Sequence, residues 1–382
     1  MRVVMVSKAL VVGAYQRKLE ELAKLPGIEL TAIVPPSWHD CRGHRKLDRT
    51  HTHGYELLTA ALAFNGSYHC HFYPTLGRLL HRLRPDILHM DEEPYNLATW
   101  HGLRLAQACG AASLFFTWQN LPRRYPWPFS FFEQANYRRA ACAIAGNEAA
   151  IAVLRSKGYR GPVTVIPQFG VDPEIFRPAT AAERGTHGNE EPQGDAPSSA
   201  AFGVGYAGGL VPEKGVDLLL PACAGLSGAW SLTILGEGPE RGRLAAQAER
   251  LGIAGRVRFL GHRPSMELPA IYRTWDVLVL PSRSRPNWVE QFGRVLIEAM
   301  ACGVPVIAAR TGELPNVIGD AGLLFEEGDV DGLTSALAAL AADGSRRAEL
   351  GQRGRARVLA RFTQAQVAAA TYHVYQQIYR VN

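Results

Sequence analysis

Short apolar segments alternate with helical segments along this chain of 382 residues, and this alternation restricts the fold more than any other feature. The apolar segments are rich in β-branched residues and are typical of buried strands. Strands that alternate with helices form parallel sheets, because each helix carries the chain back over the sheet in a right-handed crossover. The expected strands are 2–6, 30–34, 87–90, 113–117, 141–145 and 163–166, followed by 202–207, 231–235, 257–260, 277–280 and 304–308.

A polar segment interrupts the alternation. Residues 179–200 contain no large apolar side chain, so we expect a flexible linker or loop. The length of the chain is typical of two domains, and its 47% of hydrophobic residues can fill two cores. We therefore expect one α/β domain at 1–178, a second at 201–362, and an amphipathic helix within 363–382.

Composition indicates where such a protein works. The six cysteines are scattered without a Cys-x-x-Cys pair, which favours free thiols in a reducing compartment over a disulfide or zinc framework. Residues 1–6 are typical of a strand and not of a signal peptide, and no apolar run approaches the roughly 18 residues of a membrane span. We expect a cytoplasmic protein.

The formal net charge of +6 lies within residues 1–175. A basic half of this kind is compatible with peripheral contact to an anionic surface, such as the inner face of the cell membrane. Nothing in the sequence matches a nucleic-acid-binding module, so we expect no nucleic-acid partner.

Two glutamates stand eight positions apart around the start of a predicted helix. Glu290 precedes Gly293, which opens the helix, and Glu298 lies inside it. Free backbone N–H groups at a helix start bind anions, and carboxylates beside the anion accept hydrogen bonds from hydroxyls. Phosphate with hydroxyls describes a sugar nucleotide. A plain turn with two surface glutamates has the same spacing, and spacing alone leaves both interpretations open.

A second candidate site follows the strand 202–207. Gly208 and Gly209 permit close approach of a phosphate to the backbone, and Lys214 supplies a positive charge. The segment is not a Walker loop, because the order Gly-Lys-Ser/Thr is absent.

These segments together resemble family-4 glycosyltransferases of the GT-B fold, also described as glycosyl transferases group 1. The resemblance extends over residues 202–330 and includes the Glu-x7-Glu pair, the pair Pro281–Ser282, and the loops at Glu237 and at 259–263. It implies an α/β fold of two Rossmann-like doubly wound domains facing a cleft. The C-terminal helix would return to the first domain, which binds the acceptor, while the second domain binds the nucleotide-sugar donor.

The resemblance also assigns roles to residues. Lys214 would bind the diphosphate and Glu290 the donor sugar, as the main catalytic residues, and Glu298 would bind the ribose. Gly209 stands where the family has an arginine, so one cation is missing, and Arg283, Arg285 and Arg294 are the candidates to replace it. The full predicted donor site is Gly13, Gly208, Gly209, Lys214, Glu237, His262, Arg263, Glu290, Gln291, Phe292, Gly293, Arg294 and Glu298.

The first domain offers further candidates. Gly13 is either the family's glycine that admits the donor phosphates or a plain turn glycine. The strand 87–90 ends in Asp91, Glu92 and Glu93, at the edge where open α/β sheets bind ligands. We place Asp91 and Glu92 on the acceptor side, with Glu92 as a candidate proton acceptor, although a solvated loop would look the same.

Two more patterns complete the set. The loop 118–132 mixes aromatic residues with Arg123 and Arg124, which suits sugar stacking or a membrane interface; we place both arginines on the acceptor side and expect Phe131 and Phe132 in a core helix. Asp329 and Asp331 spell the Asp-x-Asp metal motif of the other glycosyltransferase fold. Acidic residues at a helix start are favoured by capping and the helix dipole, so we expect no metal.

The sequence therefore predicts a retaining, metal-independent glycosyltransferase. It would use a UDP- or GDP-linked sugar as a substrate, with no cofactor, and a hydroxyl of a glycan, a lipid-linked or a small-molecule acceptor. The alternatives are a protein of the same fold that binds a sugar nucleotide without turnover, for which the glycine at 209 is the favouring feature, and a sugar-nucleotide epimerase.

Overall fold

The computed structural model describes residues 1–40, 43–180 and 201–381, with only the backbone of Asp40 and Val381. The chain divides into two compact units: Met1–Gly170 together with the chain from Gln364 onward, and Val171–Thr363. The first unit ends at Gly170 and not at the expected 178, because Val171 and Phe176 pack into the core of the second unit. Most of the predicted linker, 181–200, lies outside the described residues.

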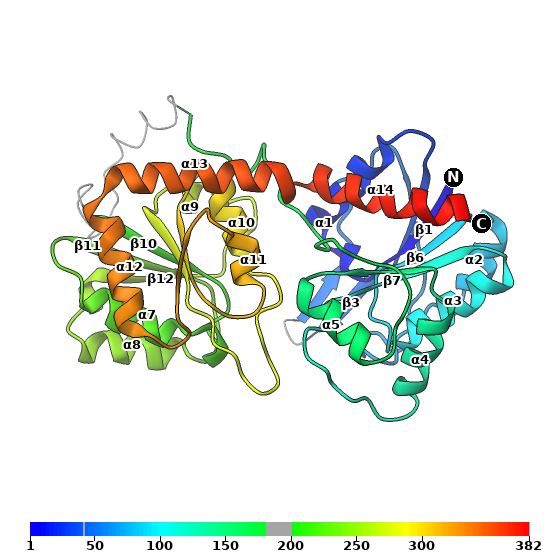
Figure 1. The fold of residues 1–382 in the computed structure, drawn as a ribbon, viewed down its shortest axis with the longest axis horizontal. Helices are drawn as coiled ribbons and strands as arrows, with labels where there is room; N and C mark the ends of the chain where they lie inside the picture. Colours follow the sequence, from blue (N-terminus) through cyan, green and yellow to red (C-terminus); the bar gives the residue numbers. More distant parts are fainter. Residues whose placement is uncertain (41–42, 181–200, 382) are drawn as a thin grey trace. The chain divides into compact units, whose positions relative to one another are not determined.

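The first unit is built on a parallel seven-stranded sheet of order β5-β2-β1-β6-β7-β8-β9 (Figure 1). Alternate residues of β1 face two different cores: Val3 and Met5 belong to one, and Val4 and Val6 to the other. Both faces are therefore covered, as expected for a parallel sheet. Its strands are β1 (Arg2–Val6), β2 (Glu29–Val34), β5 (Glu56–Thr59), β6 (Ile87–Met90), β7 (Ala112–Thr117), β8 (Cys142–Ala145) and β9 (Val163–Val165).

Helices cover this sheet on each side, and a separate antiparallel hairpin is formed by β3 (Ser37–Asp40) and β4 (Gly43–Lys46). The C-terminal helix belongs to this unit: Val374, Tyr375 and Ile378 lie in the core that contains Val3 and Met5. The helices are α1 (Gly13–Ala23), α2 (Leu76–Leu83), α3 (Leu97–Ala108), α4 (Phe129–Arg139), α5 (Glu148–Ser156) and α14 (Gln364–Val381), with the short 3-10 helix η1 (Ala9–Val11).

The second unit contains a parallel six-stranded sheet of order β12-β11-β10-β13-β14-β15. Every strand pair is parallel, so the chain returns over the sheet after each strand. The strands are β10 (Phe202–Ala207), β11 (Trp230–Leu235), β12 (Val257–Gly261), β13 (Val277–Leu280), β14 (Val306–Ala309) and β15 (Leu323–Phe325).

The helices of this unit alternate with its strands (Figure 1). They are α7 (Val216–Ala224), α8 (Arg241–Arg250), α9 (Leu268–Tyr272), α10 (Arg294–Ala301), α11 (Leu314–Ile318), α12 (Val330–Ala342) and α13 (Gly344–Arg361), with the 3-10 helices η2 (Pro212–Lys214) and η3 (Ala254–Arg256). Since the carboxyl ends of parallel strands meet at one edge, the loops after β10, β11, β12 and β13 share that edge.

The two chain segments that leave the first unit are joined to each other. The side-chain amide of Gln364 donates to the carbonyl of Gly170 at 2.9 Å and accepts from its N–H at 3.2 Å. This pair of bonds holds the start of α14 against the end of the first unit.

Candidate functional site

Lys214 and Glu290, which the sequence separates by 76 positions, form an ion pair in the second unit. Lys214 ends η2 after β10, and Glu290 lies in the loop between β13 and α10. The Lys214 Nζ lies 2.6 Å from Oε2 of Glu290, which also accepts from the Ser282 hydroxyl at 2.9 Å. Glu290 is buried, and the Lys214 Nζ stands 4.9 Å from the centre of the Trp288 ring.

Glu290, the acidic partner of this ion pair, lies in the loop that leads to the start of α10. Gly293 is the N-cap residue, and its φ of 74° lies in the left-handed region that favours glycine. A Cβ at this position would come within 2.4 Å of Leu314 Cδ2, so no other residue fits without movement. Among the described residues no side chain caps the helix, and in its first turn the Leu296 N–H donates to the Gly293 carbonyl at 2.9 Å. Of the neighbours, Gln291 is exposed and Phe292 packs against the core.

Glu298, the second glutamate of the motif, is buried inside α10 with an exposed fraction of 4%. Its Oε2 accepts from the Tyr272 hydroxyl at 2.8 Å, and its Oε1 lies 2.7 Å from Nε of Arg294. Both carboxylate oxygens of Glu298 therefore have partners within this unit. Tyr272 was not predicted, because a buried tyrosine in a short helix carries no motif.

The glycine-rich loops after β10 and β11 lie against each other. A Cβ on Gly236 would come within 1.9 Å of the Gly208 carbonyl oxygen, so Gly236 is a glycine because the two loops touch. The carbonyl of Gly209 accepts from the Tyr206 hydroxyl at 2.8 Å. Within the part of the chain that the structure describes, Val211 Cγ2, at 4.0 Å, is the one atom within reach of a Cβ on Gly209, so a side chain fits at the position where the family has an arginine.

The loops after β11 and β12 carry the remaining predicted donor residues. Oε1 of Glu237 accepts from the backbone N–H of His262 at 3.3 Å, and the N–H of Gly236 donates to the carbonyl of Gly261 at 2.9 Å. Glu237, His262 and Arg263 are exposed. They lie at the same sheet edge as Lys214, since β11 neighbours both β10 and β12.

The arginines proposed to replace the missing cation are differently placed. Arg283 donates to Oδ1 of Asp217 at 2.7 Å and to the Pro212 carbonyl at 2.9 Å. Arg294 is paired with Glu298. Arg285 is exposed in the loop before Trp288. Two of the three are thus held by carboxylates of this unit.

In the first unit, Glu92 is a buried and ionised carboxylate at the end of β6. It forms an ion pair with Lys8, accepts from the Lys8 backbone N–H at 3.1 Å, and lies 3.6 Å from Nε2 of His71. Burial raises the pKa of Glu92, but Lys8 and His71 outweigh it and hold the pKa at about 2. So strong an acid is a poor proton acceptor at neutral pH, which argues against the predicted base role of Glu92.

The other two carboxylates of this loop, Asp91 and Glu93, have raised pKa values, in contrast to Glu92. Asp91 accepts from the Ser7 hydroxyl at 2.8 Å and from the Gln168 amide at 3.0 Å, and burial raises its pKa. Glu93 accepts from the Thr117 hydroxyl at 2.6 Å and from the Trp118 N–H at 2.8 Å. Burial raises the pKa of Glu93 to about 7.

His89, in β6, is buried. Its Nδ1 lies 2.7 Å from the Tyr375 hydroxyl of α14, and burial lowers its pKa well below the ordinary value. This histidine is neutral and joins the C-terminal helix to the sheet. Lys18 is also buried and interacts electrostatically with Asp91. Burial lowers the pKa of Lys18.

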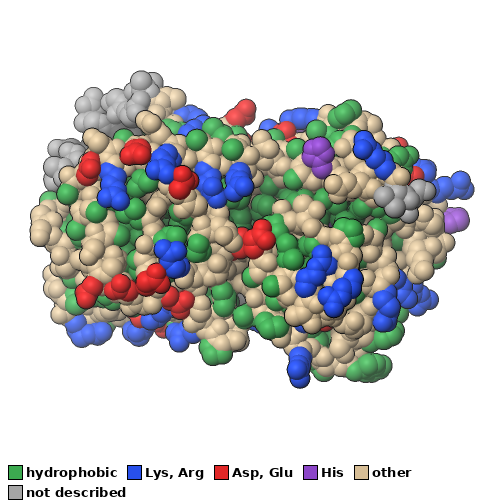
Figure 2. All heavy atoms as spheres, viewed as in Figure 1, with side chains coloured by type: hydrophobic (Ala, Val, Ile, Leu, Met, Phe, Trp, Pro, Cys, Tyr) green, Lys and Arg blue, Asp and Glu red, His purple; other side chains and the backbone are tan. Residues whose placement is uncertain are grey.

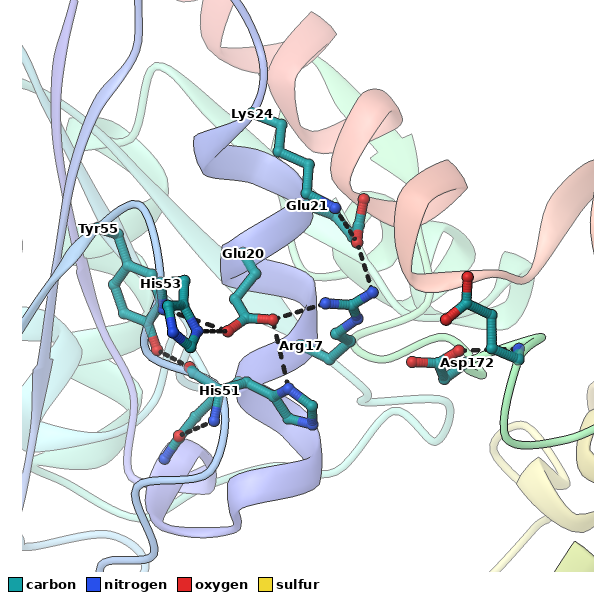
Figure 3. Close-up of polar contacts among 10 residues, drawn as sticks. Arg17, Glu20, Glu21, Lys24, His51, His53, Tyr55 and Asp172 are labelled. Atoms are coloured by element: carbon teal, nitrogen blue, oxygen red, sulfur yellow. Dashed lines mark hydrogen bonds and ion pairs between the residues drawn. The ribbon is translucent and has the colours of Figure 1, made fainter.

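Gly13, the first residue of α1, is covered by another segment of the same unit. A Cβ there would lie 2.3 Å from both Oδ2 of Asp48 and the Thr50 hydroxyl. The segment that follows is fastened to α1 through Glu20, which lies 3.3 Å from Nδ1 of His51 and 3.1 Å from Nδ1 of His53 (Figure 3). The space at Gly13 is thus taken by protein atoms.

Glu20 is the centre of this network (Figure 3). It also accepts from Arg17 at 2.7 Å, and the Tyr55 hydroxyl donates to the His51 carbonyl at 2.6 Å. Burial raises the pKa of Glu20, but the hydrogen bonds from Arg17 and His53 outweigh it and lower the pKa to about 2.

Two other predictions concern loops. Arg123 and Arg124 are exposed in the loop before α4, where Tyr125 stacks on Tyr95 with ring centres 4.1 Å apart. Asp329 caps α12, accepting from the Gly332 N–H at 2.9 Å, so the capping interpretation of this motif is confirmed.

Charged side chains of both signs are spread over the face drawn in Figure 2, with an acidic group over the second unit. Within the described residues, no group of three or more His, Cys, Asp and Glu side chains has the arrangement of a metal site. None of the helices in the described ranges combines the length and the apolar character needed to cross a membrane.

Two family models match the chain. "Glycosyl transferase 4-like domain" matches residues 12–168, and "Glycosyl transferases group 1" matches residues 195–357. The first match lies within the first unit and the second covers most of the second unit.

Curated relatives agree with these matches. The GDP-mannose-dependent alpha-(1-6)-phosphatidylinositol monomannoside mannosyltransferase of Mycolicibacterium smegmatis is 35% identical over 57% of this chain and 59% of its own length. A D-inositol 3-phosphate glycosyltransferase of Corynebacterium jeikeium is 35% identical over 46% and 43%. The chain thus spans about half the length of these two relatives. A lipopolysaccharide core biosynthesis glycosyltransferase of Rhizobium meliloti is 27% identical over 90% of this chain and 89% of its own length.

Solved structures share the fold at low sequence identity. Sucrose-phosphate synthase from Thermosynechococcus elongatus has a TM-score of 0.75 at 22% identity and covers 100% of both chains. HepE from Anabaena, solved with UDP, has a TM-score of 0.75 at 20% identity over 99% of this chain and 100% of its own. With its two doubly wound domains and both domain matches, the chain belongs to the group 1 glycosyl transferases of the GT-B fold.

Proposed function

We propose that the chain transfers a sugar from a nucleotide-diphosphate sugar to a hydroxyl acceptor. The observation that carries the proposal is the ion pair between the half-buried Lys214 and the buried Glu290, whose loop leads to the start of α10. A cation and the positive end of a helix dipole stabilise the charge that develops on a departing diphosphate. A carboxylate between them orients the sugar.

Each residue then has a distinct task. Lys214 turns from Glu290 toward the diphosphate, or shares its protons with both. The two bonds to Glu290 are made to Oε2, so we assign Oε1 to a sugar hydroxyl. Glu298 accepts from the ribose hydroxyls once Arg294 gives up Oε1. Glu237 and the backbone at His262 border the nucleotide.

The proposed reaction retains the configuration of the sugar and needs no metal. The bond between the anomeric carbon and the diphosphate oxygen breaks, and the acceptor oxygen bonds to the same carbon on the same face. The acceptor proton passes to the departing diphosphate. With this proton route the reaction does not depend on Glu92, whose low pKa suits an ion pair better than proton transfer.

The donor and the acceptor follow from chemistry and from the relatives. We propose a UDP- or GDP-linked sugar, since one relative is described as GDP-mannose-dependent and HepE was solved with UDP. We propose a hydroxyl of a glycan, of a lipid or of a small polyol as the acceptor. The relatives named above act on a phosphatidylinositol mannoside, on D-inositol 3-phosphate or in lipopolysaccharide synthesis.

The second candidate is binding without turnover, which the glycine at position 209 favours because it removes one diphosphate cation. Incubation of the purified chain with UDP- and GDP-sugars separates the two. Release of the nucleoside diphosphate supports the transferase. A donor that raises the melting temperature of the chain and stays intact with every acceptor supports binding alone.

A further inference from the structure

The outer face of α4 and the loop before it expose large aromatic side chains. Trp127 is 81% exposed and Phe131 is 47% exposed, among the most exposed aromatic residues of the described chain. The expectation that Phe131 would lie in the core is wrong, whereas Phe132, its neighbour, is buried against Trp100 with ring centres 5.0 Å apart. Trp127 and Phe131 stand four positions apart in the sequence, and exposed apolar side chains that form one patch mark an interaction site.

Trp127 lies in the loop before α4 and Phe131 in the first turn of α4. Contacts of Tyr125 hold this loop in place. Tyr125 stacks on Tyr95, its hydroxyl accepts from the Gln119 amide at 3.3 Å, and the Lys157 ammonium lies 4.7 Å from the centre of its ring. Because the loop is already held by these contacts, little conformational freedom of its backbone is lost when Trp127 and Phe131 contact a partner.

The same region is strongly basic. Residues 97–140 contain five arginines and a single acidic residue, Glu133. Glu133 is buried and paired with Lys157 at 2.8 Å, so the acidic residue of this stretch does not offset the exposed charge. Figure 2 shows hydrophobic and basic side chains together at the lower edge of the first unit, where Figure 1 places α4 and its preceding loop. We name the exposed set the aromatic–arginine surface: Arg104, Arg123, Arg124, Trp127, Phe131 and Arg138.

We infer that the aromatic–arginine surface docks the protein on an anionic lipid bilayer. Tryptophan and phenylalanine enter the interface between headgroups and acyl chains, where their apolar rings leave water and the indole N–H stays near the headgroups. Arginines at the rim pair with lipid phosphates, and each cation near an anionic surface strengthens binding about fivefold. An anionic bilayer interacts favourably with both the arginines and the exposed rings of this surface. A neutral bilayer offers a favourable interaction to the rings alone.

The test is vesicle sedimentation of the full chain. The vesicles contain either phosphatidylcholine alone or an equal mixture of phosphatidylcholine and phosphatidylglycerol. The inference predicts binding to the mixed vesicles, weaker binding to the neutral ones, and loss of the difference at high salt, where charges are screened. The double variant Arg123→Gln/Arg124→Gln should weaken binding to mixed vesicles about thirtyfold, which corresponds to two cations.

Two further variants separate the contributions. Trp127→Ser/Phe131→Ser should weaken binding to both kinds of vesicle, and should lower the melting temperature only slightly, because Trp127 is 81% exposed and Phe131 is half exposed. The matched control Arg346→Gln/Arg361→Gln removes two exposed arginines of the second unit and should change binding less than twofold.

Equal binding to both vesicles, or an equal loss in the control and in the Arg123/Arg124 variant, would overturn the inference. So would a monomer–dimer equilibrium that the Trp127/Phe131 variant abolishes while vesicle binding stays unchanged, because the surface would then join two copies of the chain. Vesicle binding needs no sugar donor, so its failure leaves the proposed transfer reaction untouched.

Discussion

Replacing Glu298 by glutamine should weaken nucleotide binding while leaving the fold nearly intact. In the structure Oε2 of Glu298 accepts from the buried Tyr272 hydroxyl, and Oε1 faces Arg294. A glutamine oxygen still accepts from Tyr272. The lost ion pair involves a partly exposed guanidinium and is worth less than about 1 kcal/mol.

The magnitude of the binding effect follows from the charge. Hydrogen bonds to a charged acceptor contribute about 1.5–3 kcal/mol, against about 1 kcal/mol for a neutral one. Glu298→Gln should therefore lower the affinity for UDP or GDP about tenfold or more, since 1.4 kcal/mol is a factor of ten. Glu298→Ala is a poorer test, because it leaves the Tyr272 hydroxyl buried without an acceptor and costs about 1–3 kcal/mol of stability.

Tyr272→Phe is the matched control. It removes the other partner of the same carboxylate and leaves the charge in place. We expect it to lower stability by about 1 kcal/mol and to leave nucleotide affinity nearly unchanged. Isothermal titration with UDP and GDP gives the affinities, and urea unfolding gives the stabilities. An unchanged nucleotide affinity in a folded Glu298→Gln variant would remove Glu298 from the site.

The other predictions concern the diphosphate cations and one carboxyl group. Lys214→Ala should lower kcat more than it raises the donor KM, because the charge matters most as the diphosphate leaves; steady-state kinetics that show a change in KM alone would make Lys214 a plain binding residue. Gly209→Arg should keep or raise donor turnover, since a side chain fits there; a loss of turnover with unchanged melting temperature would mean that another cation already fills that space. Glu93 has a folded-state pKa of about 7, above the ordinary 4.5. Between pH 4.5 and pH 7 the folded chain therefore keeps a proton on Glu93 that the unfolded chain has released. Stability should fall from about pH 4.5 to about pH 7 by up to about 1.4 kcal/mol per pH unit from this group, and Glu93→Gln should remove that part; parallel stability curves for the two proteins would refute the assignment.

Sequence reasoning found the strands because buried parallel strands are continuous apolar runs. β1, β6, β10 and β13 begin and end where they were expected. It missed β5 and β15, which are short edge strands with few buried positions, and the hairpin β3–β4, whose residues are mostly polar. Such strands are defined by pairing, which no local pattern records.

The same limit applies to the site. Glu290 and Lys214 were recognised from their motifs, but their direct contact and the bond from Ser282 depend on two loops, those after β10 and β13, meeting at one sheet edge. The three carboxylates after β6 look alike in the sequence. Their pKa values differ because Lys8 lies at Glu92, while Glu93 is paired with neutral donors only.

The central claim is that the Lys214–Glu290 pair serves a nucleotide-diphosphate donor without metal. The most direct measurement is the release of UDP or GDP from the corresponding sugars by the purified chain in EDTA, compared with Lys214→Ala. The account predicts release in EDTA, slow without acceptor, and at least tenfold slower in the variant, which corresponds to about 1.4 kcal/mol of lost charge stabilisation. Release that stops in EDTA and returns with magnesium or manganese, or that proceeds equally in Lys214→Ala, would contradict it.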